Sequence, residues 1–168
     1  SWGFTFSGRD HMTAFLNSEI FEKMSQKVID NMGVRVLAAG VDQPRILYTR
    51  EPVGSLNDVQ GIKMRVPGIK AYVKLWETVG TIPTSVAWAE AFLALQTGVV
   101  DGAEADASGA YSQKFHVAAP NITMTNHIMS SFHISVNETK WNSLSSDQKA
   151  ILKEAAQEAV AWASETAK

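Results

Sequence analysis

The chain has 168 residues, of which 45% are hydrophobic and 19% are charged. This composition is typical of a globular domain or of part of a larger protein, and it excludes intrinsic disorder over most of the chain. The formal net charge of −2 and the lack of cysteine argue against a nucleic-acid partner, disulfides, thiolate nucleophiles and most structural zinc sites.

Strand and helix patterns alternate along the chain. The predicted elements, in order, are a helix over residues 10–31, strands over 34–39 and 45–49, a loop over 52–58, a strand over 61–68, helices over 69–79 and 85–97, a strand over 99–103, a helix over 108–115, strands over 122–125 and 128–136, and a final helix from 145 through 162. Gly40 is expected to end the first strand, and the residues from Ser145 to Gln148 form a capping box. The alternation predicts an α/β fold class with a largely parallel sheet.

The strand over residues 61–68 carries a candidate functional side chain. Its apolar residues alternate with Lys63 and Arg65, so one face packs on a core while the other is cationic. The strand stops at Pro67-Gly68, which places Arg65 near its carboxyl end and just before a helix N-terminus. Both features favour an anion, and a guanidinium suits a carboxylate. The residues alone leave open a solvent-exposed arginine on an edge strand.

Three carboxylates lie within or just after the predicted strand over residues 99–103. Asp101, Glu104 and Asp106 allow a general acid and base pair, but Asp101-Gly102 is also an ordinary turn pair. At the carboxyl end of a strand, Glu104 is expected to face the crevice where α/β sheets bind ligands. A carboxylate there is better suited to orient a cation than to attack a substrate.

Other motifs with chemical meaning are missing from the sequence. It has no nucleophile elbow and no glycine-rich nucleotide cradle. The histidines have no metal-ligand spacing; they are His11, His116, His127 and His133. We therefore predict no metal and no cofactor.

Two motifs at their observed separation resemble a known family. The sequence GIKMRVP at residues 61–67, followed by ALQTGVVDG at residues 94–102, is similar to the DctP-type substrate-binding proteins of tripartite ATP-independent periplasmic (TRAP) transporters. Shorter stretches extend the resemblance over nearly the whole chain; they are PTSVAWAE at 83–90, KFHV at 114–117 and TNH at 125–127.

The resemblance implies a two-lobed α/β architecture that closes around its ligand. Members of the family are about twice as long, so the chain is expected to be an internal fragment, which accounts for the absence of a signal peptide at Ser1-Trp2-Gly3. Residues 1–42 are predicted to belong to lobe one, residues 43–130 to form most of lobe two, and residues 131–168 to return to lobe one.

The resemblance also assigns roles to particular residues. Arg65 falls on the arginine that clamps the substrate carboxylate, Arg45 on a second basic contact, and Trp88 on a side chain that packs over the ligand. Glu104 matches an acidic residue of the crevice. The next position is commonly Asn in the family, and here it is Ala105 followed by Asp106. Ala105 is expected to make room for a bulkier ligand, and Asp106 to accept from ligand hydroxyls, which favours a sugar acid.

The resemblance implies a binding protein rather than an enzyme. We predict a periplasmic receptor that binds a small carboxylate and delivers it to the membrane subunits of a TRAP transporter. One alternative is an α/β enzyme that acts on an organic acid through Glu104, Asp106 and a histidine. Another is a structural fragment that binds no ligand.

Overall fold

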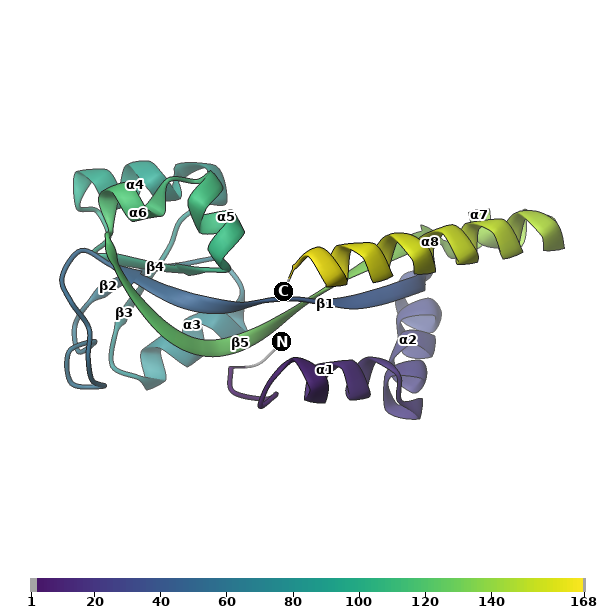
Figure 1. Ribbon diagram of the computed structural model, residues 1–168, viewed down its shortest axis with the longest axis horizontal. Helices are drawn as coiled ribbons and strands as arrows, with labels where there is room; N and C mark the ends of the chain where they lie inside the picture. The colour runs from purple at the N-terminus through teal and green to yellow at the C-terminus, as the bar shows by residue number, and fades with distance from the viewer. Residues whose placement is uncertain (1–2, 168) are drawn as a thin grey trace. The chain divides into compact units, whose positions relative to one another are not determined.

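The computed structural model describes residues 3–167, which form two compact units (Figure 1). Unit 1 consists of residues 3–5 and 44–129, and unit 2 of residues 6–43 and 130–167. This division lies close to the predicted limits 43–130, although residues 3–5 were expected with lobe one. They group with unit 1, where the backbone N–H of Phe4 donates to the carbonyl oxygen of His127 at 2.6 Å. The assignment of the units to two lobes stays a prediction.

Within residues 3–167, the sheet has five strands in the order β3-β2-β4-β1-β5. Their bounds are β1 Val34–Thr49, β2 Lys63–Val66, β3 Ile82–Ser85, β4 Gly102–Ala105 and β5 Asn121–Asn137. Strand β2 pairs in parallel with β3 and β4, whereas β4 pairs with β1 antiparallel, with Leu47 opposite Glu104. The α/β class is confirmed, but the sheet is mixed rather than largely parallel.

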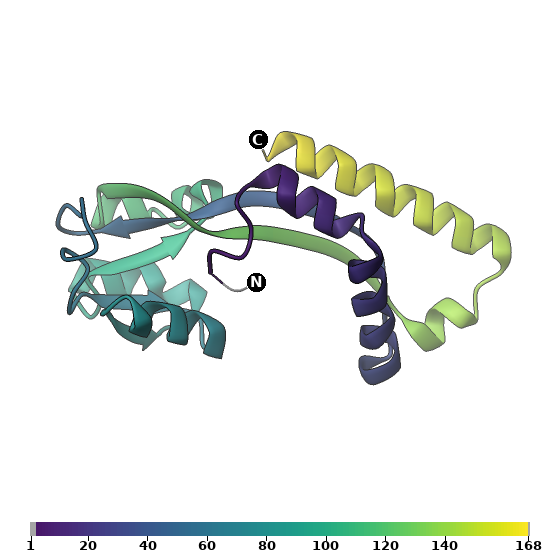
Figure 2. The same cartoon turned by 90° about the horizontal axis from the view of Figure 1, so that it is seen from below.

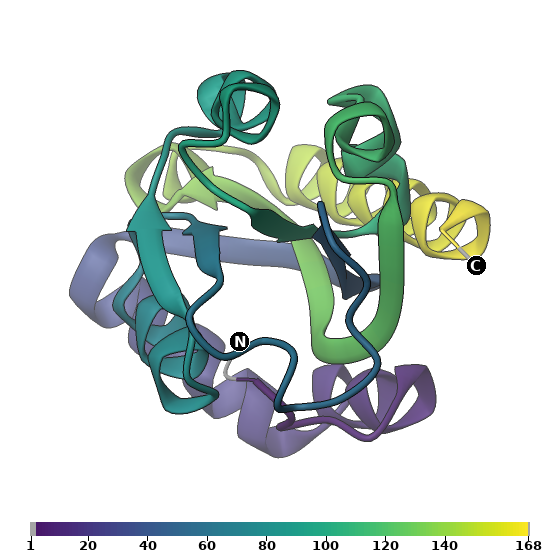
Figure 3. The same ribbon diagram turned by 90° about the vertical axis from the view of Figure 1, so that its left-hand side faces the viewer.

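Helices cover both faces of the sheet in unit 1 (Figure 3). They are α3 Lys70–Thr78, the short 3-10 helix η1 Trp88–Glu90, α4 Ala91–Thr97, α5 Ala107–Ser112 and α6 Phe115–Ala118. Helices α4 to α6 lie on one side of the sheet, and α3 lies on the other. The helix predicted over residues 85–97 starts earlier than the helix in the structure. Ser85 is the last residue of β3, and α4 begins only after η1. The predicted helix over residues 108–115 ends earlier, at Ser112, and Lys114, with φ 58°, separates α5 from α6, which was not expected as a helix of its own.

Each face of this sheet has its own hydrophobic cluster. One contains Ile46, Tyr48, Leu95, Ala103 and Phe115, all at most 4% exposed. The other contains Leu47, Met64, Val66 and Trp76. Neighbouring residues of β1 therefore belong to opposite clusters, as the alternation of a strand requires.

Unit 2 contains the remaining helices and parts of β1 and β5, the long strands seen in Figure 2. The helices are α1 Arg9–Leu16, α2 Glu19–Met32, α7 Glu138–Asn142 and α8 Ser146–Thr166. The helix predicted over residues 10–31 is divided, because the Ser18 hydroxyl accepts from the Phe21 N–H at 3.3 Å and caps α2. The predicted capping box at Ser145 is confirmed, whereas α7 was not expected.

Two predicted strand breaks are absent from the structure. Strand β1 passes through Gly40, where an added Cβ atom would lie 2.3 Å from Ser164 Oγ and 2.8 Å from a Val160 methyl group. The glycine therefore permits close packing rather than ending the strand. Strand β5 likewise continues through Asn126, whose φ of 46° is left-handed. None of the described helices is long and apolar enough to cross a membrane.

Candidate functional site

Arg65 lies on β2 and is only 3% exposed. Its Nε donates to the Val86 carbonyl oxygen at 2.9 Å, and its guanidinium carbon lies 5.4 Å from the centroid of the Trp88 ring. Among residues 3–167, no carboxylate forms an ion pair with it. Burial lowers the pKa of Arg65, with the charge of Glu104 acting in the opposite direction and that of Arg45 reinforcing the decrease. The side chain is thus a buried cation without an ion-pair partner in the described part of the chain, rather than the exposed edge arginine that the residues alone had left open.

Arg45 and Glu104 form the second part of the site, as a buried ion pair. Arg45 Nε donates to Glu104 Oε2, and Arg45 Nη2 donates to Glu104 Oε1 at 2.9 Å and to the Glu104 carbonyl oxygen at 3.0 Å. Glu104 is fully buried, while 16% of the Arg45 side chain is exposed. Burial works against the charged form of Arg45, but the hydrogen bonds and charge of Glu104 outweigh it, and the pKa of Arg45 is raised. Glu104 therefore orients a cation, as expected at this position.

The two arginines lie near one edge of the sheet but on opposite faces. Strands β2 and β4 are parallel, with Arg65 opposite Ala103, so their carboxyl ends share that edge. Arg65 follows Met64 and precedes Val66, which belong to the same cluster as Leu47. Arg65 therefore points to the other face, toward the side of Trp88, whose ring lies 5.3 Å from Phe115. The structure brings Arg45 together with Glu104, and Arg65 together with Trp88.

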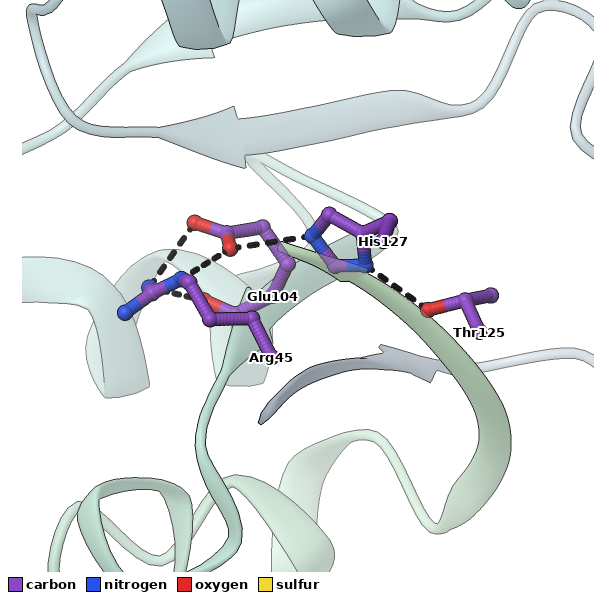
Figure 4. A network of polar contacts seen from close by, with 4 residues as sticks. All are labelled: Arg45, Glu104, Thr125 and His127. Carbon is purple, nitrogen blue, oxygen red and sulfur yellow. Dashed lines mark hydrogen bonds and ion pairs between the residues drawn. The ribbon is translucent and has the colours of Figure 1, made fainter. Parts of the chain in front are cut away.

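His127 and Thr125 complete the buried network around Glu104 (Figure 4). His127 Nε2 lies 3.3 Å from Glu104 Oε2, and His127 Nδ1 lies 2.7 Å from Thr125 Oγ1. His127 is 2% exposed and meets the Trp76 ring edge-on, with 5.0 Å between ring centroids. The sequence places Thr125 and His127 in the TNH stretch, and it predicts no metal spacing for His127 and only an unspecified histidine in the enzyme alternative, so neither residue was assigned to Glu104. The available signal was their presence in the resembling motif.

Ala105 and Asp106 follow Glu104, and both have structural contacts. The Ala105 side chain is fully buried in the cluster with Ile46 and Phe115. Asp106 Oδ1 accepts from the Gly109 N–H at 2.7 Å and from Ser108 Oγ at 2.9 Å, and so caps α5. Their expected roles beside a ligand stay predictions.

A pocket of about 190 Å³ in unit 1 is lined mainly by apolar side chains and reaches His127. None of the six residues predicted for the binding site lines it; these are Arg45, Arg65, Trp88, Glu104, Ala105 and Asp106. No group of three or more His, Asp or Glu residues among residues 3–167 is arranged to hold a metal ion. With both Glu104 oxygens bound to Arg45 and Asp106 capping a helix, the acid and base pair of the enzyme alternative gains no support.

The sequence over residues 1–168 matches the family described as bacterial extracellular solute-binding protein, family 7. The chain belongs to this family. A solute-binding protein of Roseobacter denitrificans is 33% identical over 154 residues, which is 91% of this chain and 47% of that protein. The chain thus spans about half the length of the curated relatives it matches.

Solved structures of TRAP periplasmic solute-binding proteins have the same fold. A structure from Roseobacter denitrificans with bound L-galactonate is 30% identical in sequence and has a TM-score of 0.89. The match covers 98% of this chain and 55% of the Roseobacter chain. A structure from Pseudomonas putida F1 with bound D-glucuronate is 31% identical and has a TM-score of 0.87. That match covers 94% of this chain and 52% of the Pseudomonas chain. Both ligands are sugar acids. The family resemblance inferred from the motifs is confirmed, and the names of these relatives are those of binding proteins rather than enzymes.

Proposed function

We propose that this chain is part of a periplasmic receptor that binds a sugar acid and delivers it to the membrane subunits of a TRAP transporter. The observation that carries the proposal is Arg65, which is 3% exposed and forms no ion pair among the described residues. A buried cation without a counter-ion is costly, and a ligand carboxylate removes that cost on binding. The sugar acids bound by the relatives support this ligand class.

The other residues of the site support the same function. Trp88 is 38% exposed and lies against Arg65, so its ring presents an apolar and π surface beside the cation. Sugar rings pack on such surfaces through their C–H groups while their hydroxyls bind polar groups. Arg45 is held by Glu104, which fixes the direction of its guanidinium. We assign Arg45 as a second contact whose charge is already balanced, and Arg65 as the group that recognises the carboxylate.

The test is ligand-dependent thermal unfolding of the full-length parent protein. Aldonates, uronates, C4-dicarboxylates and 2-oxo acids are added separately, since a ligand that binds the folded state raises the melting temperature. We expect a shift with aldonates or uronates that is lost in Arg65→Ala. Arg50→Ala is the matched control, because Arg50 is an exposed arginine of unit 1. A near wild-type shift in Arg65→Ala contradicts the assignment of Arg65, and no shift with any acid contradicts the receptor.

A further inference from the structure

The network around Glu104 contains His127, which has a hydrogen-bonding neighbour at each ring nitrogen. Thr125 and His127 are two residues apart on β5, and Asn126 between them has a left-handed φ of 46°. Asparagine tolerates this conformation better than most residues with a Cβ atom. The Thr125 hydroxyl lies 2.7 Å from His127 Nδ1 (Figure 4).

The hydrogen bonds restrict where the imidazole protons lie. An ionised carboxylate only accepts hydrogen bonds, so the His127 Nε2 that lies 3.3 Å from Glu104 Oε2 must carry a hydrogen. The tautomer with its hydrogen on Nδ1 would instead direct the Nε2 lone pair at the carboxylate. Two states remain, a neutral Nε2–H imidazole that accepts from Thr125 and an imidazolium that donates to it.

The surrounding charges favour the neutral state. Glu104 is fully buried and already binds Arg45 through both carboxylate oxygens. An imidazolium at His127, 2% exposed and packed against Trp76, would add a second buried cation to a carboxylate whose charge Arg45 already balances, and burying an uncompensated charge is strongly unfavourable.

We propose that Thr125 donates its hydroxyl hydrogen to His127 Nδ1, that His127 is thereby held as the neutral Nε2–H imidazole, and that these two positioning residues hold Glu104 against Arg45. The hydrogen-bond chain then runs in one direction, from the Thr125 hydroxyl through the imidazole to the carboxylate. Glu104 in turn sets the direction of the Arg45 guanidinium. The effect on ligand binding rests on the proposed function, in which Arg45 is a ligand contact, whereas the protonation state does not.

The protonation state is tested by ¹⁵N NMR of the histidine side chains in the full-length parent protein without ligand. We expect His127 Nε2 to be protonated and Nδ1 to be unprotonated and hydrogen-bonded at neutral pH. In Thr125→Val, which replaces the hydroxyl by a methyl group of similar size, the Nδ1 resonance should move toward the value of a nitrogen without a hydrogen bond. Thr125→Ser should restore it. The matched control is Thr123→Val, since Thr123 lies on the same strand but donates to the Val53 carbonyl oxygen.

Two results of this experiment overturn the proposal. One is a protonated Nδ1 in the wild-type chain, whether as the other neutral tautomer or as the imidazolium. The other is an Nδ1 resonance that Thr125→Val leaves unchanged.

The positioning role is tested by the affinity of the full-length parent for D-glucuronate and L-galactonate. Loss of one hydrogen bond corresponds to a factor of roughly two to ten in affinity. We expect a loss of this size in Thr125→Val, recovery in Thr125→Ser and no loss in Thr123→Val. Wild-type affinity in Thr125→Val overturns the positioning role. If the wild-type parent binds neither acid while the NMR result holds, the proposed function fails and the protonation assignment stands.

Discussion

The two units differ in how much apolar surface they bury. Unit 1 has a hydrophobic cluster on each face of its sheet, with residues such as Leu95, Met64 and Phe115 fully buried. Helix α2 of unit 2 has no buried residue, although its sequence is amphipathic. Helix α8 buries only Ala156 and Val160. The amphipathic face of α2 is therefore only partly covered, because the extent of burial depends on the partner surface and not on the pattern alone.

Unit 2 also contains an open pocket of about 770 Å³, formed by residues of α1, α2, β1 and α8. Large apolar side chains of these helices remain exposed, among them Ile20 at 63% and Trp162 at 71%. Buried apolar area contributes about 25 cal/mol per Å², so most of the hydrophobic stabilisation belongs to unit 1. Unit 1 also holds every residue of the candidate site. We expect the global free energy of unfolding to report mainly on unit 1.

The largest difference is expected between the two arginine–glutamate pairs. Glu104→Gln leaves Arg45 buried without a counter-charge, which costs about 3–5 kcal/mol of unfolding free energy. Glu138→Gln in unit 2 removes the partner of Arg35 in a more exposed pair, whose side chains are 18% and 32% exposed, and its effect should be smaller. Urea denaturation of both variants makes the comparison, and equal losses would mean that burial does not distinguish the pairs.

Truncation of one leucine in each unit compares the cores directly. Leu95→Ala in α4 removes a fully buried side chain, so we expect a loss of about 2–5 kcal/mol. Leu152→Ala in α8 removes a side chain that is 41% exposed, so the loss should stay below about 1 kcal/mol. Chemical denaturation of the pair measures both values. A loss at Leu152 as large as that at Leu95 would contradict the assignment of the main core to unit 1.

Removal of helix caps is expected to have a smaller effect that is similar in the two units. Asp106→Ala removes the cap of α5, and Ser145→Ala removes half of the capping box of α8. Each should cost about 1 kcal/mol in thermal unfolding, because a cap acts locally and does not depend on a core. For Asp106 the same variant separates two roles. If Asp106→Ala lowers sugar-acid affinity in the parent protein by more than Ser145→Ala does, then Asp106 contacts the ligand as well as capping α5.

The smallest expected effect is a dependence of stability on pH from two carboxylates, the exposed Asp58 in unit 1 and the partly buried Glu138 in unit 2. Hydrogen bonds from the Gly54 N–H and from Ser55 lower the pKa of Asp58, and the hydrogen bonds from Arg35 lower that of Glu138. A lowered folded-state pKa stabilises the protein above the unfolded-state pKa, and that contribution disappears as the pH falls through the folded-state value. The melting temperatures of Asp58→Asn and Glu138→Gln should therefore approach that of the wild type below about pH 4. A difference that grows on acidification would reverse the sign of these shifts.

Local sequence patterns determined much of the fold. The strand at Arg65, the helix that follows it and the capping box at Ser145 were all predicted, because alternation and capping involve residues close in the chain. The pair of motifs at residues 61–67 and 94–102 also sufficed to recognise the family, which the comparison confirmed.

The tertiary structure decided what depends on distant residues. Whether β1 continues through Gly40 depends on the packing of Ser164 and Val160, and whether β4 is parallel or antiparallel to β1 depends on pairing across the chain. The burial of Arg65 and its lack of a carboxylate partner among residues 3–167 could not be read from the cationic face of a strand. Likewise, only the fold brings His127 to Glu104, 23 residues earlier in the chain. Charge balance and burial are properties of neighbours in space, and a linear pattern of residues does not specify those neighbours.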